Sequence, residues 1–329
     1  MVNSAKSTLL LAVCTLFGAA IGVAMMPWIF PRAHTEMSRT SVLLTALRTD
    51  RNVPPVVVLG DSAVMAGVDT RQLTPAHGRF GAWNLGSTGQ ELSESLLIAD
   101  ALPDSVKTVV IGLHFDKMTK PATAMPRNKY VAYVMSGYRP SPEVVRLSEG
   151  LENQELHELL ASNRLRVMMW SRWVVRAATD LSVRRSIRED MDLTRAETDL
   201  YHPSPYTRAV DAVALDHLMR TFDVRSNHFK TQTDAVMLLR GMHDILSRRG
   251  KRVVFVVLPE HPRRRAMTTA GFYADAHQWV TNMRGEGIDI IDLHDALDAG
   301  DFIDHIHPAD RGAARLTSLI SRSLRPDGA

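Results

Sequence analysis

Short runs of mostly apolar, often β-branched residues recur along the chain, and each is closed by a glycine, a proline or a polar stretch. Such runs are typical of strands that are buried on both faces of a parallel sheet. Longer segments with apolar residues at helical spacing lie between them. We predict strands over 56–59, 83–85, 108–112, 253–258 and 288–293, and helices over 90–102, 234–248 and 311–324. This alternation predicts an α/β fold with a doubly wound parallel sheet of about five strands.

The alternation stops between Lys117 and Lys230, where the chain is charged and has no strand run of comparable strength. We predict helices over 141–160 and 164–179 in this segment. We interpret 117–230 as a helical insertion that forms a cap beside the sheet edge where ligands bind. The alternative is that the insertion only packs on a stalk or on a partner. The core domain then consists of residues 53–116 and 231–329.

The N-terminus predicts a membrane anchor over residues 1–31. No charged side chain occurs from Ser7 to Pro31, and this run spans roughly 35 Å as a helix, enough for one crossing. We expect a single-pass protein of the inner (cytoplasmic) membrane, with the bulk of the chain periplasmic or extracytoplasmic. A cleaved signal peptide is the alternative; the bulky Met26–Pro27–Trp28 at the end of the run favours an uncleaved anchor. We interpret residues 32–52 as a stalk.

Composition narrows the class of protein. With 45% hydrophobic and 23% charged residues over 329 positions, the chain has the material for a sizeable core and is not of the disordered class. The net charge is only +3, and the basic runs are balanced by nearby acids, so we predict no nucleic-acid partner. The single cysteine, Cys14, excludes a disulfide framework and a cysteine-based zinc site.

Candidate chemistry begins at Gly60–Asp61–Ser62, directly after the first predicted strand. Catalytic groups of open parallel sheets lie at the carboxyl ends of strands, although a serine here is also a normal helix N-cap. Near the C-terminus, Asp304 and His307 are three residues apart. This spacing lets the carboxylate hold one imidazole nitrogen while the other faces a serine. We therefore predict Ser62 as nucleophile, His307 as general base and Asp304 as the group that orients it.

At these residues the sequence resembles the SGNH/GDSL hydrolase superfamily. The matching blocks are Gly60–Asp61–Ser62, Gly86 within 84–87, Gly112–Leu113–His114, and Asp304–His305–Ile306–His307. The resemblance covers about 53–116 and 231–325 and implies a three-layer, flavodoxin-like sheet. It also implies an oxyanion hole made by the backbone N–H groups of Ser62 and Gly86. The third block normally supplies an asparagine donor, and His114 stands in its place, where an imidazole N–H in the right tautomer could donate instead.

Three further residues are candidates for contacting substrate. Asp116 follows the third strand, His261 follows the fourth, and His305 lies inside the last block. Each has a plainer interpretation, as a cap, a turn residue and a neighbour of the triad. His305 and His307 form a His-x-His pair, but the sequence shows no third ligand at matching spacing, so we predict no metal and no cofactor.

Within the superfamily, the anchor and the short phrases are most similar to the membrane-anchored branch that modifies cell-envelope polymers, which includes the alginate O-acetylation and lipoteichoic-acid D-alanylation proteins. This resemblance implies an O-acyltransferase or esterase that moves acyl groups, above all acetyl, to or from a polysaccharide, with a membrane-bound O-acyltransferase as a partner. The sequence does not separate transferase from esterase. The alternatives are a non-catalytic scaffold or polysaccharide-binding component of an envelope complex, and a simple detoxifying or lipid esterase.

Overall fold

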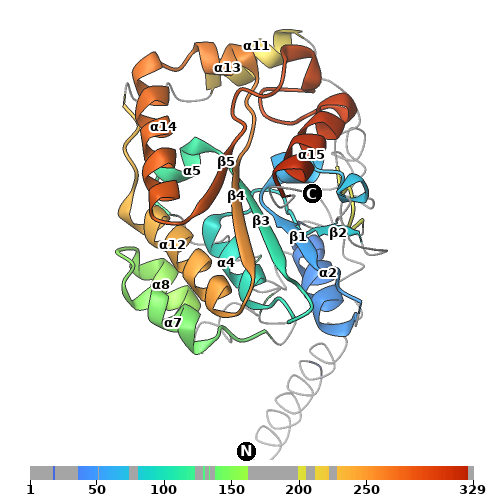
Figure 1. Ribbon diagram of the computed structural model, residues 1–329, viewed down its shortest axis with the longest axis vertical. Coiled ribbons are helices and arrows are strands. Elements are labelled where there is room, and N and C mark those ends of the chain that lie inside the picture. The colour runs from blue at the N-terminus through green and yellow to red at the C-terminus, as the bar shows by residue number, and fades with distance from the viewer. Residues whose placement is uncertain are drawn as a thin grey trace, which may run out of the picture.

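The computed structural model describes residues 18, 36–50, 52–73, 81–122, 129, 133, 138–161, 199–204, 212–221 and 228–324 (Figure 1). Nearly all of the predicted anchor, 1–31, and the whole predicted helix over 164–179 lie outside these residues. None of the helices in the described part of the chain combines the length and apolar character that a membrane crossing requires.

The centre of the molecule is a five-stranded, all-parallel sheet in the order β2-β1-β3-β4-β5. The strands are β1 (Val56–Leu59), β2 (Ala82–Asn84), β3 (Thr108–Leu113), β4 (Arg252–Val257) and β5 (Asp289–Asp292). All five predicted strands are confirmed to within a residue or two. The direction in which strands are added reverses between β1 and β3, and ligands bind outside the carboxyl ends of strands at such a point.

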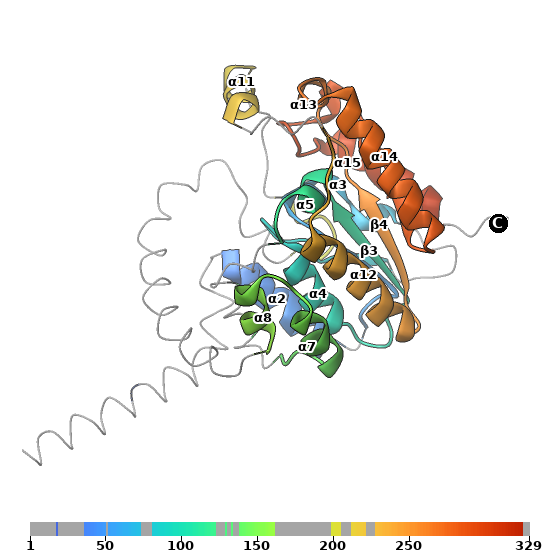
Figure 2. The same ribbon diagram turned by 90° about the vertical axis from the view of Figure 1, so that its left-hand side faces the viewer.

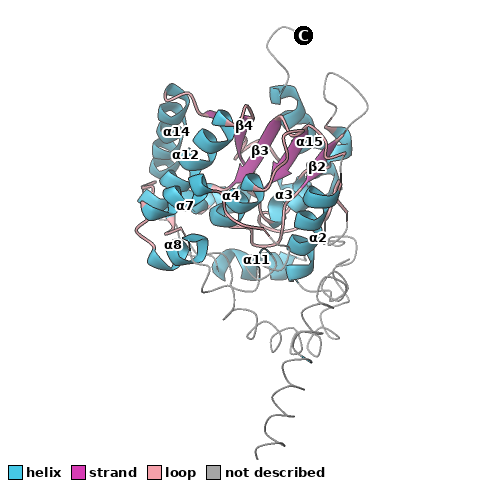
Figure 3. Cartoon of the chain, turned by 90° about the horizontal axis from the view of Figure 1, so that it is seen from below, coloured by secondary structure: helices cyan, strands magenta, loops and turns pink. Residues whose placement is uncertain are grey.

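Helices cover both faces of the sheet, as Figure 3 shows. Alternate residues of β3 belong to different cores: Val109 and Ile111 face one layer, and Val110 faces the other. The first core is shared with α2 (Glu36–Thr49), α4 (Leu92–Asp100), α12 (Thr233–Arg248) and α14 (Ala270–Gly285), and the second with α3 (Ser62–Gly67) and α15 (Asp310–Leu324). The α/β class of the fold is confirmed.

Helix α14 was not among the elements predicted from the sequence. Its buried residues, Phe272, Ala276, Val280 and Met283, follow one helical stripe. The remaining short elements are η2 (Thr70–Gln72), α5 (Phe115–Thr119), α13 (Pro262–Ala266) and η3 (Ala299–Asp301).

The interpretation of 32–52 as a stalk was wrong, because α2 is part of the folded domain. Leu43, Leu44 and Leu47 are buried in the core beside β1. Arg39 is also buried, and its guanidinium donates to the backbone oxygens of Gly86 (2.5 Å), Asn84 (2.7 Å) and Asp199 (3.0 Å). Leu43 and Leu44 lie four and three positions before Leu47, so the three leucines form one apolar stripe that α2 buries in the core.

The predicted helix over 141–160 is two helices, α7 (Pro142–Glu149) and α8 (Gln154–Ala161). Asp234 holds the break between them, since its carboxylate accepts from the backbone N–H groups of Glu152 (2.8 Å) and Asn153 (3.0 Å). Both helices lie at the end of the molecule opposite α13, as Figures 1 and 2 show. They therefore do not form the predicted cap. Of the described insertion helices, only α11 (Ala212–Thr221) lies at the same end as α13 (Figure 2).

Candidate active site

Ser62 is positioned by the turn that ends β1. Gly60 has a φ of +149°, and a Cβ there would meet the Val64 side chain at 2.3 Å, so this position requires glycine. Asp61 caps α3, with its carboxylate accepting from the backbone N–H of Ala63 at 3.0 Å. Ser62 is the first residue of α3, so its own backbone N–H has no acceptor within the helix.

The loop before α15 brings His307 and Asp304 to Ser62. His307 Nε2 lies 2.8 Å from Ser62 Oγ, and His307 Nδ1 lies 2.6 Å from Asp304 Oδ2. The other carboxylate oxygen, Oδ1, accepts from the backbone N–H groups of Ile306 (2.9 Å) and His307 (2.8 Å). An antiparallel bridge between Phe302 and Pro308 closes this loop. The three residues that the sequence selected, 245 positions apart at the extremes, form one hydrogen-bonded chain.

The charge state of Asp304 determines which ring nitrogen of His307 carries the proton. Burial alone would raise the pKa of Asp304, but the hydrogen bond and the charge of His307 together with the two backbone donors outweigh it and lower the pKa to about 2. An ionised carboxylate only accepts, so Nδ1 of His307 carries its proton. Nε2 is then left to accept from the Ser62 hydroxyl, which is the arrangement of a general base.

Gly86 does not offer the oxyanion donor that was predicted. Its backbone N–H donates to the Asn84 side-chain oxygen at 3.0 Å. The Asn84 amide in turn donates to the backbone oxygens of Val64 (3.0 Å) and Val68 (2.8 Å), which ties the end of β2 to α3. This block therefore braces the nucleophile helix. Gly89, at the exposed tip of the following turn with φ +61°, was not singled out from the sequence.

A buried ion pair supports the same turn from behind. Lys129 donates to Glu94 at 2.9 Å and to Ser87 Oγ at 3.2 Å, and also to the backbone oxygen of Thr88. Glu94 accepts in addition from Ser87 (3.0 Å) and from Thr40 of α2 (3.2 Å). The Glu94 and Lys129 side chains are 0% and 2% exposed. This pair could not be predicted from the sequence, because Lys129 lies within the predicted insertion, 35 residues beyond its partner.

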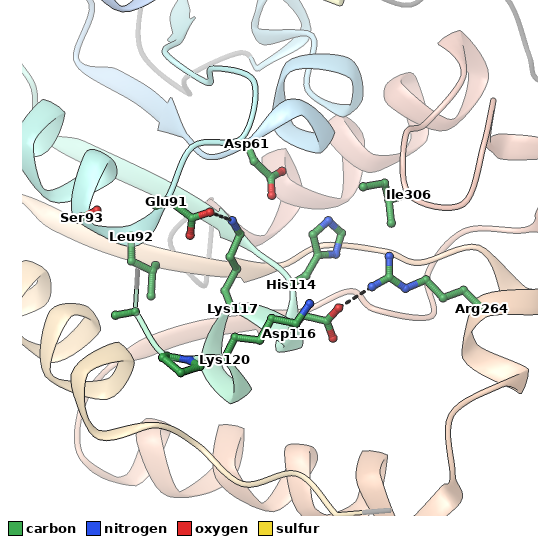
Figure 4. Close-up of a pocket in the computed structure, with 12 residues that line it drawn as sticks. Asp61, Glu91, Leu92, Ser93, His114, Asp116, Lys117, Lys120, Arg264 and Ile306 are labelled. Carbon is green, nitrogen blue, oxygen red and sulfur yellow. Dashed lines mark hydrogen bonds and ion pairs between the residues drawn. The ribbon is translucent and has the colours of Figure 1, made fainter. Parts of the chain in front are cut away.

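A pocket of about 250 Å³ opens beside the triad (Figure 4). Asp61 and Ile306, the chain neighbours of Ser62 and His307, form part of its wall. Two ion pairs contribute to the wall, Arg264–Asp116 at 2.5 Å and Lys117–Glu91 at 3.0 Å, and Lys120 also lines the pocket. Asp116, one of the candidate substrate residues, thus lies in the pocket wall with its carboxylate held by Arg264.

His114 lies in the same wall, next to Asp61 in Figure 4. It is only 5% exposed, yet neither ring nitrogen has a hydrogen-bond partner among the described residues. Its Nδ1 is 3.8 Å from Glu260 Oε1, outside hydrogen-bond distance. Burial is the main cause that lowers the pKa of His114. The ring is therefore neutral at pH 7, with one N–H and one lone pair to offer.

The other two candidate substrate residues are not in the described pocket wall. His261 caps α13, since its Nδ1 accepts from the backbone N–H of Arg263 at 3.1 Å, and its ring packs against Phe302. His305 is buried beside the triad, with Nδ1 3.8 Å from Asp304 Oδ1. Burial is the largest cause that lowers the pKa of His305 to about 4. The plainer interpretations, a turn residue and a neighbour of the triad, fit both positions.

No family model matches the chain, and no curated protein matches it.

Proposed function

We propose that the protein is a serine-dependent enzyme that transfers acyl groups or hydrolyses their esters. The observation that carries the proposal is the Ser62–His307–Asp304 chain, with links of 2.8 and 2.6 Å, beside a pocket at the switch point of the sheet. A serine, a base and an orienting carboxylate in hydrogen-bond contact are the requirements of nucleophilic acyl chemistry. A pure binding module has no physical need for this set.

The reaction runs in two half-reactions. Ser62 Oγ attacks the ester carbonyl while His307 Nε2 takes the hydroxyl proton, and Asp304 stabilises the imidazolium that forms. The tetrahedral intermediate collapses as His307 returns the proton to the leaving alcohol oxygen, which leaves the acyl group on Ser62. An acceptor hydroxyl then attacks the acyl-enzyme with His307 again as base, and Ser62 recovers its proton.

We assign the stabilisation of the oxyanion to the backbone N–H of Ser62 and to the N–H of His114. The first is without an acceptor within α3, and the second lines the pocket. Each such donor in a dry site is worth a large rate factor. Gly86 has no part in this assignment because its N–H donates to Asn84.

The pocket supports a short acyl group on a polar, hydroxyl-bearing substrate. Its volume of about 250 Å³ lies below the range of roughly 300–1,000 Å³ typical of drug-sized ligands. Its wall combines charged side chains with the neutral His114. We therefore propose an O-acetyl ester of a cell-envelope polysaccharide as substrate. The anchor expected over 1–31 adds the proposal that the enzyme works at the outer face of the inner membrane with a membrane-bound O-acyltransferase.

Hydrolysis of an aryl acetate by the full-length chain tests the proposal. We expect acetate release by wild type, its loss in Ser62→Ala, and its retention in Ser318→Ala, a matched serine change on the exposed side of α15. A polysaccharide acceptor that diverts acetate from water would identify a transferase. A folded wild-type chain that releases no acetate would instead favour a non-catalytic scaffold.

A further inference from the structure

A second cluster of chemistry-bearing side chains lies at the edge strand, apart from the triad. It consists of Asp292, the last residue of β5, His294 just after it, and His277 of α14. His294 Nδ1 is 3.0 Å from Asp292 Oδ1, and His277 Nε2 is 3.3 Å from Asp292 Oδ2. One ligand atom from each residue lies within 4.8 Å of the other two. Three donor atoms therefore converge on one small volume.

We propose that this cluster is a binding site for a divalent transition-metal ion of the zinc class. Zinc bonds of 2.0–2.1 Å at tetrahedral angles place donor atoms about 3.3 Å apart. Each imidazole nitrogen lies at about this distance from one carboxylate oxygen of Asp292, His294 at 3.0 Å from Oδ1 and His277 at 3.3 Å from Oδ2, and one ligand atom from each residue lies within 4.8 Å of the others. Two imidazoles and one carboxylate suit zinc and its neighbours, whereas Mg²⁺ and Ca²⁺ prefer all-oxygen sites. Three protein ligands leave a fourth position for water.

The fold holds two of the three ligands in place before any ion arrives. The His294 ring stacks on Tyr273 with centroids 4.9 Å apart and also contacts Phe115. Its backbone oxygen accepts from the backbone N–H of Glu260 at 3.0 Å. Asp292 accepts from the backbone N–H of His294 at 3.2 Å, which orients the carboxylate. Rigid supports of this kind position metal ligands.

The third ligand gives the ion a path from solvent. The His277 side chain is 50% exposed on α14, while His294 is 9% exposed. Binding through His294 Nδ1 replaces the hydrogen bond between this nitrogen and Asp292, and the neutral ring then carries its proton on Nε2. The bound ion adds a further link between α14 and the end of β5, which already share a hydrogen bond from Arg284 to the backbone oxygen of Ile290 at 2.8 Å. We therefore expect a stabilising site, and this inference does not depend on the proposed acyl chemistry.

This cluster could not be predicted from the sequence, because His277 lies fifteen positions before Asp292, on a helix that was not predicted. The pair that the sequence suggested for metal was His305 and His307. Both lie at the triad, where His307 is already engaged by Asp304 and Ser62.

Thermal unfolding of the full-length chain, without a polyhistidine tag, tests the proposal with ZnCl2 alone as the probe. At a zinc concentration a hundredfold above Kd we expect Tm to rise by roughly 5 °C, and MgCl2 to give no such rise. His277→Ala and Asp292→Asn should each weaken zinc binding, measured by calorimetry, at least tenfold. The matched control is His228→Ala, which removes an exposed histidine that faces Asp275 at 3.0 Å without forming part of the cluster.

Two outcomes would overturn the site. One is a wild-type chain that neither binds zinc nor gains stability from it. The other is zinc binding that survives unchanged in His277→Ala, which would place the ion elsewhere, for example on the histidines near the triad. His277 is half exposed, so its removal should leave the fold intact, and Co²⁺ absorption in the visible region reports independently whether the site is tetrahedral.

Discussion

The triad and the pocket wall that faces it each contain a buried histidine, and the two histidines differ in their hydrogen bonding. His307 has both ring nitrogens engaged, by Ser62 and by Asp304. His114, equally buried, has neither nitrogen in a hydrogen bond with a described residue. Leaving a buried polar group without a partner costs about 1–3 kcal/mol, so a fold retains such a group where a ligand completes it. The hydrogen bonds of the triad are therefore complete in the free protein, whereas those of His114 in the pocket wall are not.

This difference separates two kinds of contribution. The triad residues should control the chemical step, since their geometry is set before substrate arrives. His114 should act through the bound substrate or the transition state. Mutations in the two regions are therefore expected to leave different signatures in kinetics and in stability.

The largest effect is expected from removing a residue of the triad. His307→Ala removes the base, and we expect kcat for aryl acetate hydrolysis to fall by at least about 10⁴-fold with little change in KM. His228→Ala, at an exposed site, serves as the control. Steady-state kinetics on both variants give the comparison. A His307→Ala variant that keeps a tenth of the wild-type rate would contradict the role of the triad.

The second largest effect is expected at the buried Glu94–Lys129 ion pair, which has its hydrogen bonds formed in the free protein but has no catalytic role. Glu94→Gln leaves Lys129 buried without its counter-charge, and we expect the free energy of unfolding to fall by about 3–5 kcal/mol. Arg240→Gln breaks an exposed pair with Glu286 and should cost less than about 1 kcal/mol. Urea unfolding curves measure both values. Equal, small losses would show that the Glu94–Lys129 pair does not hold the turn at 87–90.

Substitutions of His114 test whether the pocket wall contributes to catalysis through a bound substrate. We expect His114→Ala to lower kcat/KM by about 10²-fold, as loss of one oxyanion donor does, and His114→Asn to recover part of the loss because its amide also donates. Stability should stay the same or rise slightly, since an unsatisfied buried group is removed. Kinetics and Tm on the same preparations check this. A large drop in Tm with unchanged kcat/KM would make His114 a structural residue.

The smallest effect concerns the charge of Asp304. Its pKa is lowered from 3.8 to about 2 in the folded protein. The ionised group therefore stabilises the fold above about pH 4, and this contribution is lost as the pH falls toward 2. The shift corresponds to on the order of 2 kcal/mol. Unfolding of wild type and Asp304→Asn between pH 6 and pH 2 should show the steeper decline in wild type. Parallel curves would mean that Asp304 is not stabilised as an anion.

Much of this architecture could be predicted from the sequence because the informative residues are local. The composition of 253–258 alone predicts a buried strand, and Asp304 and His307 are close enough in the chain for their pairing to be predicted. The role of Ser62 was harder to predict, since a helix cap and a nucleophile have the same local sequence and only the position of His307 distinguishes them.

What could not be predicted depends on long-range contacts. The bonds from Arg39 to Gly86 and Asn84, which tie α2 to the folded domain, join residues more than 40 positions apart. Gly86 lost its predicted role because of a side chain two residues away. The break between α7 and α8 is held by Asp234, some 80 positions later. None of these partners is marked by spacing or periodicity.

Covalent labelling of Ser62 tests the central claim most directly. The full-length chain is treated with a fluorophosphonate probe and digested, and the labelled peptide is identified by mass spectrometry. We expect one modified peptide that contains Ser62, no label in Ser62→Ala, and labelling slowed at least about 10³-fold in His307→Ala. A folded wild-type protein that stays unlabelled, or a label that persists in Ser62→Ala, would contradict a nucleophilic serine at this position.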